Sequence, residues 1–138
     1  MNRSRLLPLA AVCGLLAVPS LAGATSLRGQ RSVAGVRSTL AAYDNAVLAG
    51  NGKAACSLLT AGAQKEVAES NHLPSCQKSI ELAGELLKVS PKQAAQLRAY
   101  ASKVKVTLHG DTASVPKLNG GGRGELTYTH GLWYLAKS

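Results

Sequence analysis

The fold of this chain is decided by residues 103–115, which have the sequence KVKVTLHGDTASV. Apolar and polar residues alternate from Lys103 to Leu108, and the alternation resumes after the turn His109-Gly110-Asp111. Alternation with a period of two is typical of a strand that buries one face. The stretch therefore predicts a β-hairpin that begins at Lys103, where the apolar period changes from the helical 3.6 of the preceding residues.

The residues before the hairpin predict a block of helices. Apolar residues recur at three- and four-residue steps from Val33 to Val47, and the stop signal Gly50-Asn51-Gly52 ends this helix. Ser75 and Ser90 are predicted to be N-caps of later helices. These later helices are expected at 53–59, 64–70, 76–88 and 91–100. Thr60 and Gly62 are expected to break the helix between the first two.

The residues after the hairpin predict two more strands. Leu126 and Tyr128 alternate with polar residues, His130-Gly131 suits a two-residue connection with positive φ, and Leu132–Leu135 is continuously apolar. The glycine-rich segment 119–124 leads into a strand, whereas a phosphate cradle leads into a helix N-terminus. We expect a flexible loop there, with Arg123 as a weak anion contact. Helices followed by an antiparallel meander predict the α+β class.

The N-terminus has the pattern of a secretory signal peptide. Arg3 and Arg5 precede an apolar run from Leu6 to Leu21, and Ala22-Gly23-Ala24 is an A-x-A cleavage signal. We expect cleavage before Thr25, which makes the protein secreted or part of the cell envelope. The apolar run is short and interrupted for a membrane span of about 20 residues, but an uncleaved anchor stays open as an alternative.

Removal of the signal at 1–24 leaves 114 of the 138 residues, which is the usual size of one domain. Residues 25–32 are polar and lack periodicity, so they predict a flexible leader, and residues 33–138 predict a single domain. The formal net charge falls from +9 to +7 when the two signal arginines leave. The mature protein is therefore still basic.

The positive charge bears on the class of partner. Long-range attraction would draw such a domain to anionic lipid, cell-wall polymers or acidic proteins, although dispersed basic residues also occur on ordinary solvated surfaces. A nucleic-acid partner is not expected, because the chain has no recognition motif and its one Trp and four Tyr do not alternate with basic residues.

Two cysteines remain after the signal, and an isolated pair in an oxidising compartment predicts a disulfide between Cys56 and Cys76. It would close a loop of about 20 residues and stabilise the fold by about 3 kcal/mol. The three histidines lie in predicted turns or loops without metal-site spacing, and no Gly-x-Ser-x-Gly elbow is present. We therefore assign no catalytic residue, no metal site and no cofactor.

The order of these pieces resembles the nuclear transport factor 2-like superfamily, which includes ketosteroid isomerases, polyketide cyclases and small exported bacterial proteins. Residues 36–43, 49–60, 104–115 and 131–135 carry the resemblance. It implies a cone, in which a long first helix and a short second helix close over a curved antiparallel sheet around an apolar pocket. It also implies a homodimer through the sheet. Residues 61–100 depart from the family, because they are expected to be helical where the family has an additional strand pair.

Within such a cone, six residues are candidates to line the interior, although each of them could equally fill the core. They are Val36, Leu40, Tyr43, Tyr128, Trp133 and Leu135. The catalytic site of the isomerases does not transfer, because no acid occupies an inward-facing position of a predicted strand. Asp44 lies about 100° around the helix from Tyr43, so we expect it at the edge of the core or in solvent.

Three functions remain open. The first is a non-enzymatic, disulfide-stapled domain that holds an apolar small molecule or packs against a partner, and we favour it. The second is an isomerase or cyclase, which requires an enclosed acid of raised pKa beside a tyrosine in an open cavity. The third is electrostatic capture of an anionic envelope polymer, which requires Lys103, Lys105, Lys117 and Arg123 on one face and binding that weakens with salt.

Overall fold

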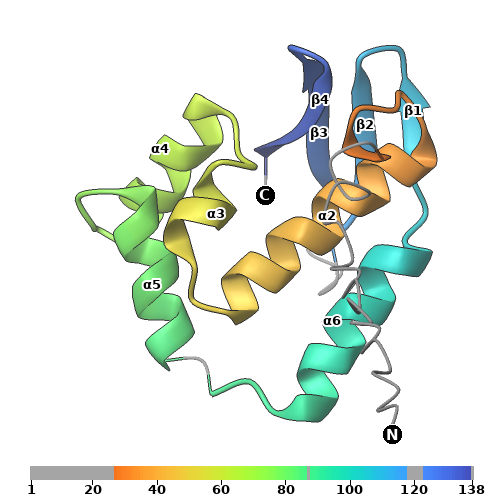
Figure 1. Ribbon diagram of the computed structural model, residues 1–138. Coiled ribbons are helices and arrows are strands. Elements are labelled where there is room, and N and C mark those ends of the chain that lie inside the picture. Colours follow the sequence, from red (N-terminus) through yellow and green to blue (C-terminus); the bar gives the residue numbers. More distant parts are fainter. Residues whose placement is uncertain (1–26, 87, 118–122, 138) are drawn as a thin grey trace, which may run out of the picture.

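A computed structural model describes residues 27–86, 88–117 and 123–137. Helices precede strands along the chain, which confirms the predicted α+β class (Figure 1). The helices are α2 (Val33–Leu48), α3 (Gly52–Cys56), α4 (Ala61–Ser70), α5 (Cys76–Leu86) and α6 (Pro91–Lys103). The strands are β1 (Thr107–His109), β2 (Thr112–Pro116), β3 (Arg123–Thr129) and β4 (Leu132–Lys137). The predicted signal peptide, and residues 119–122 of the predicted loop, lie outside the described residues.

The four strands form an antiparallel meander in the order β1-β2-β3-β4. His130 and Gly131 connect β3 to β4 with φ angles of 51° and 79°, as the sequence predicts for a two-residue hairpin. Alternate residues are buried along β2 and β3, so the sheet has an inner face that packs in the core and an outer face. Ala113, Val115 and Leu126 belong to the inner face.

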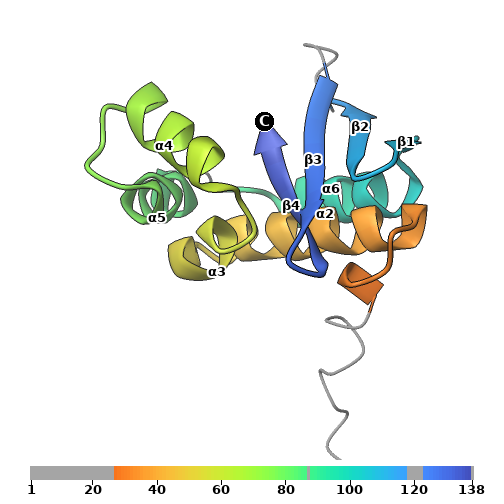
Figure 2. The same cartoon turned by 90° about the horizontal axis from the view of Figure 1, so that it is seen from above.

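Helix α2 runs across the sheet beside α6 (Figure 2). The Ser32 hydroxyl caps α2 by accepting from the Gly35 amide. The centre of the core contains Val36 and Leu40 of α2, which are buried together with Trp133 and Leu135 of β4. The Arg37 guanidinium donates to the Val104 carbonyl through Nε (3.1 Å) and Nη2 (2.9 Å), which ties α2 to the C-terminal end of α6.

The remaining helices form an arm held by the predicted disulfide, which joins Cys56 of α3 to Cys76 of α5 with a Cα–Cα distance of 6.1 Å. The arm is fixed to the edge of β4, where the Leu135 amide donates to Leu58 and the Leu135 carbonyl accepts from Thr60. These bonds extend the sheet by a short parallel bridge. None of the described helices is both long enough and apolar enough to cross a membrane.

The element boundaries differ from the prediction at several places, and the helix predicted at 53–59 ends at Cys56. Thr60 does not break a helix but caps α4, because its hydroxyl accepts from the Ala63 amide, and Gly62 lies inside that helix. Helix α6 continues to Lys103 from a complete capping box at Ser90 and Gln93. The strand predicted from Lys103 consequently begins only at Thr107. Helix α5 is described as far as Leu86, and Lys88, its predicted end, is not helical.

The described part of the predicted flexible leader, residues 27–32, is hydrogen-bonded to the sheet. The Gly29 carbonyl accepts from the Tyr128 hydroxyl (2.7 Å), and the Gln30 carbonyl accepts from the Trp133 indole (2.8 Å). The Arg31 guanidinium lies 4.6 Å from the Tyr128 ring centroid. Polar composition suggested a free leader, but its backbone carbonyls satisfy aromatic donors that would otherwise be unpaired. We call residues 27–32 the N-terminal strap.

Candidate functional site

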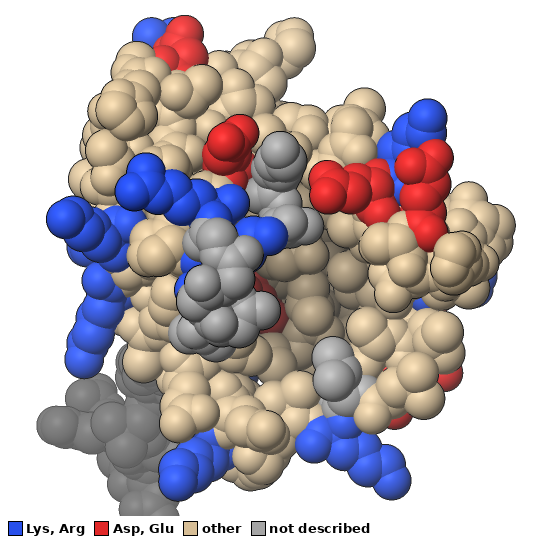
Figure 3. Space-filling view, turned by 180° about the vertical axis from the view of Figure 1, so that it is seen from behind, with Lys and Arg blue, Asp and Glu red and all other residues tan. Residues whose placement is uncertain are grey.

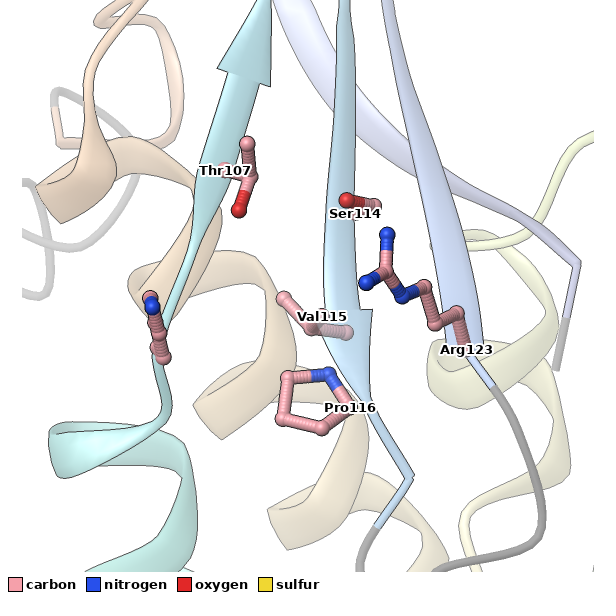
Figure 4. Close-up of a pocket in the computed structure, with 6 residues that line it drawn as sticks. Thr107, Ser114, Val115, Pro116 and Arg123 are labelled. Carbon is pink, nitrogen blue, oxygen red and sulfur yellow. The ribbon is translucent and has the colours of Figure 1, made fainter.

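A depression of about 150 Å³ opens where β2 ends and β3 begins. It is smaller than the roughly 300 Å³ at which drug-sized ligand pockets begin, so it suits one small chemical group. We call it the basic groove, because two of its six lining residues are cationic (Figure 4). The six lining residues are Lys105, Thr107, Ser114, Val115, Pro116 and Arg123.

Four segments contribute residues to the groove, and strand pairing brings three of them together. Thr107 of β1 lies opposite Ser114 of β2, and Pro116 at the end of β2 lies opposite Arg123 at the start of β3. The Arg123 side chain extends from its strand toward Ser114 (Figure 4). Lys105 enters from the connection between α6 and β1. Two cationic residues and two hydroxyl residues therefore line one small depression.

The charge of the groove is not neutralised within the described part of the chain. No Asp or Glu is among the groove residues, and neither Lys105 nor Arg123 forms an ion pair with another described residue. By contrast, the described ion pairs lie elsewhere, as between Arg31 and Asp111 at 3.0 Å. Two unneutralised cations beside a small concave surface raise the local positive potential and favour an anion.

Basic side chains also gather on the surface around the groove, where Glu125, opposite Ser114, is an acidic neighbour. Lys and Arg side chains gather over the side that carries β1, β2 and α6, and acidic side chains are more frequent over α4 and α5 (Figure 3). Of the four cations predicted to share a face, the groove brings together Lys105 and Arg123. Lys103 ends α6 and Lys117 follows β2, and neither of them lines the groove.

A second depression, of about 580 Å³, lies on the outer face of the sheet. It shares Ser114 and Arg123 with the basic groove, so the two depressions are continuous. We call it the outer-sheet depression. Its remaining residues are His109, Thr112, Ala113, Glu125, Leu126, Thr127 and Ala136.

The six residues predicted to line an interior pocket lie in or against the core. Val36, Leu40, Trp133 and Leu135 are buried core residues, and Tyr43 and Tyr128 pack partly buried against them. None of the six lines the basic groove or the outer-sheet depression. Their role in lining a pocket stays a prediction, and their observed role is packing.

Asp44 is half-buried on α2, which agrees with its expected place at the edge of the core. Burial raises the pKa of its carboxyl to about 6. Burial also raises the pKa of Tyr43 on α2 and of Tyr100 on α6, and the nearby charge of Asp44 adds to both shifts. No sequence pattern indicates this cluster, because Tyr100 is 56 positions from Asp44 and only the packing of α6 on α2 brings it near.

Other kinds of site lack support within the described residues. No group of three or more His, Cys, Asp or Glu there could hold a metal ion. Cys56 and Cys76 are joined in the disulfide, so neither is a free thiol. In the comparisons with known proteins, no protein-family model matches this sequence, and no curated protein or solved structure matches it significantly.

Proposed function

We propose that this chain is an exported, non-enzymatic binding domain that captures an anionic group in its basic groove. The supporting observation is that Lys105 and Arg123 line the same small groove as Thr107 and Ser114, without an acid among the groove residues. A carboxylate, sulfate or phosphate would accept charge-assisted hydrogen bonds from both cations. The small volume fits a substituent of a larger molecule, and we place that molecule in the cell envelope.

Export and the nuclear transport factor 2-like arrangement belong to the same proposal. A disulfide persists in oxidising compartments, which agrees with a signal peptide at 1–24. The arrangement is supported by a long helix that packs across an antiparallel sheet with Trp133 buried between them. The described part of 61–100 is helical, with connecting turns, so the proposed cone is a reduced one.

The test is binding of polyglutamate, whose side chains offer carboxylates and no other functional group. Lys105→Gln and Arg123→Gln should each weaken binding about tenfold, since a hydrogen bond to a charged group contributes about 1.5 kcal/mol or more. Lys92→Gln removes an exposed charge at the far end of α6 and should change affinity less than twofold. Equal losses in all three variants would mean that net charge, and not the groove, causes binding.

The isomerase or cyclase alternative has one observation in its favour. Asp44 is a half-buried acid of raised pKa whose charge acts on two tyrosines, as a general acid–base site requires. Neither the basic groove nor the outer-sheet depression is lined by Asp44, however. The binding function is therefore preferred. This preference would be reversed if Asp44→Asn abolished anion binding and Lys105→Gln did not.

A further inference from the structure

The outer face of the sheet is rich in hydroxyl groups. Strand register places His109, Thr112, Thr127 and Tyr134 in one row across all four strands. Thr107, Ser114 and Glu125 form the next row. The neighbouring positions on the same strands are buried on the inner face, as for Ala113, Leu126 and Trp133. The side chains of these two rows therefore belong to the opposite, outer face.

This face is a polar surface, and its hydrogen-bonding capacity is directed outward. The Thr112 hydroxyl donates its proton to the His109 carbonyl (2.9 Å), and the Thr127 hydroxyl donates to the Asp111 carbonyl (3.4 Å). Each oxygen consequently keeps lone pairs that can accept from a ligand. The Glu125 carboxylate adds a further acceptor on the same face. A fitting ligand thus carries many hydroxyl donors.

The dimensions point to an extended ligand. Neighbouring strands lie about 4.8 Å apart, so a row across four strands spans about 14 Å. The outer-sheet depression, at about 580 Å³, covers part of this span and is continuous with the basic groove through Ser114 and Arg123. A ligand that fills both has an anionic group at one end and a polar body that crosses the sheet.

We propose that the outer face binds an anionic polysaccharide, with a charged substituent in the basic groove and sugar rings along the row Thr112, Thr127 and Tyr134. This inference rests on the proposed anion-binding function. Sugar hydroxyls donate to the threonine oxygens and to Glu125, and the Tyr134 ring provides an apolar surface for a ring face. Glu125 repels the anionic substituent, which fixes the direction of the chain toward Arg123.

The same observations disfavour other anionic partners. A lipid surface would need large apolar side chains, and the rows of the outer face are polar apart from the Tyr134 ring. The described exposed large apolar residues are Leu27, Leu82, Leu86 and Leu108, and none of them belongs to the two rows. An acidic peptide would satisfy the groove but would bring few hydroxyl donors to the threonines.

The test compares two polymers of equal length and charge, oligogalacturonate and polyglutamate, on the purified protein. Wild type should bind oligogalacturonate about tenfold more tightly, and neutral dextran should bind more weakly than either. Thr127→Val combined with Tyr134→Ala should remove the tenfold preference and leave polyglutamate affinity within twofold. Ser70→Ala, which removes an exposed hydroxyl from α4, is the control and should keep the preference.

Equal binding of the two polymers by wild type would overturn the polysaccharide inference and leave anion capture intact. A preference that survives in the double variant would overturn it as well. If neither polymer binds, or if Arg123→Gln weakens neither, the proposed function fails and this inference fails with it. If the double variant does not fold, Thr127→Val alone serves as the test, because this substitution is close to isosteric. The single variant should reduce the preference for oligogalacturonate about threefold.

Discussion

The indole Nε1 of Trp133 donates a hydrogen bond of 2.8 Å to the carbonyl oxygen of Gln30, which joins β4 to the N-terminal strap. The same carbonyl oxygen lies only 2.1 Å from the position that a Cβ atom on Gly35 would occupy. Helix α2 therefore needs glycine at 35 so that the strap can reach the indole. One carbonyl thus links the strap, the first helix and the last strand.

Gly35→Ala should destabilise the protein by about 2 to 3 kcal/mol, because the strap must move away and leave the Trp133 donor without its partner. Denaturant unfolding measures the change. Gly62→Ala is the control, since its Cβ would meet nothing within 4 Å and alanine favours a helix interior by about 0.5 to 1 kcal/mol. A Gly35→Ala protein as stable as wild type would show that the strap does not contribute to the fold.

Reduction of the Cys56–Cys76 disulfide should lower the free energy of unfolding by about 3 kcal/mol, because the bond closes a loop across 20 positions of sequence separation. Unfolding curves with and without reductant measure this loss. The double variant Cys56→Ala, Cys76→Ala should be equally unstable under both conditions. A wild-type protein that is unaffected by reductant would mean that the arm of α3, α4 and α5 is held by packing alone.

Asp44→Asn should stabilise the protein at neutral pH. The folded-state pKa of about 6 lies above the ordinary 3.8, so the folded state holds the proton more tightly. The free energy of unfolding of wild type consequently falls as pH rises from about 4 to about 6. With partial solvent screening, we expect a gain of about 1 to 2 kcal/mol for Asp44→Asn at pH 7.

Unfolding of both proteins at pH 3.5, 5 and 7 checks this sign. The difference between them should become small at pH 3.5, where Asp44 is protonated in the folded state and largely protonated in the unfolded state. A difference that is constant with pH would contradict the raised pKa of the carboxyl.

Glu125→Gln should strengthen binding of polyglutamate about two- to fivefold, because it removes the acid next to Arg123 in the outer-sheet depression. The gain should shrink as salt rises from 50 to 200 mM, since screening weakens the repulsion. Glu69→Gln removes an acid that pairs with Lys65 on α4 and should leave affinity unchanged. Weaker binding by Glu125→Gln would place the anion away from Arg123.

The sequence predicts the fold best where one physical signal acts alone. The apolar period identifies α2, and the His130-Gly131 turn identifies the last hairpin. Prediction fails where signals compete. Val104 and Val106 alternate like a strand, but α6 extends to Lys103 and strand β1 begins only at Thr107. The strap was missed because its contacts to Trp133 and Tyr128 use backbone carbonyls, which carry no sequence pattern.

The candidate site was only partly predictable. Lys105 and Arg123 are two of the four cations that electrostatic capture requires on one face, and the structure places both of them in one groove. Their meeting depends on the register of Thr107 with Ser114 and of Pro116 with Arg123, which the alternation of polar and apolar residues does not give by itself. The burial of Asp44 likewise depends on how α6 packs on α2.

The most direct test of the central claim is a two-dimensional amide NMR titration of the protein with polyglutamate. Binding in the basic groove predicts that the largest shifts fall at Lys105, Thr107, Ser114 and Arg123, and that they disappear in Arg123→Gln. Shifts spread over the lysines of α4, α5 and α6, or unchanged in Arg123→Gln, would contradict a dedicated anion site.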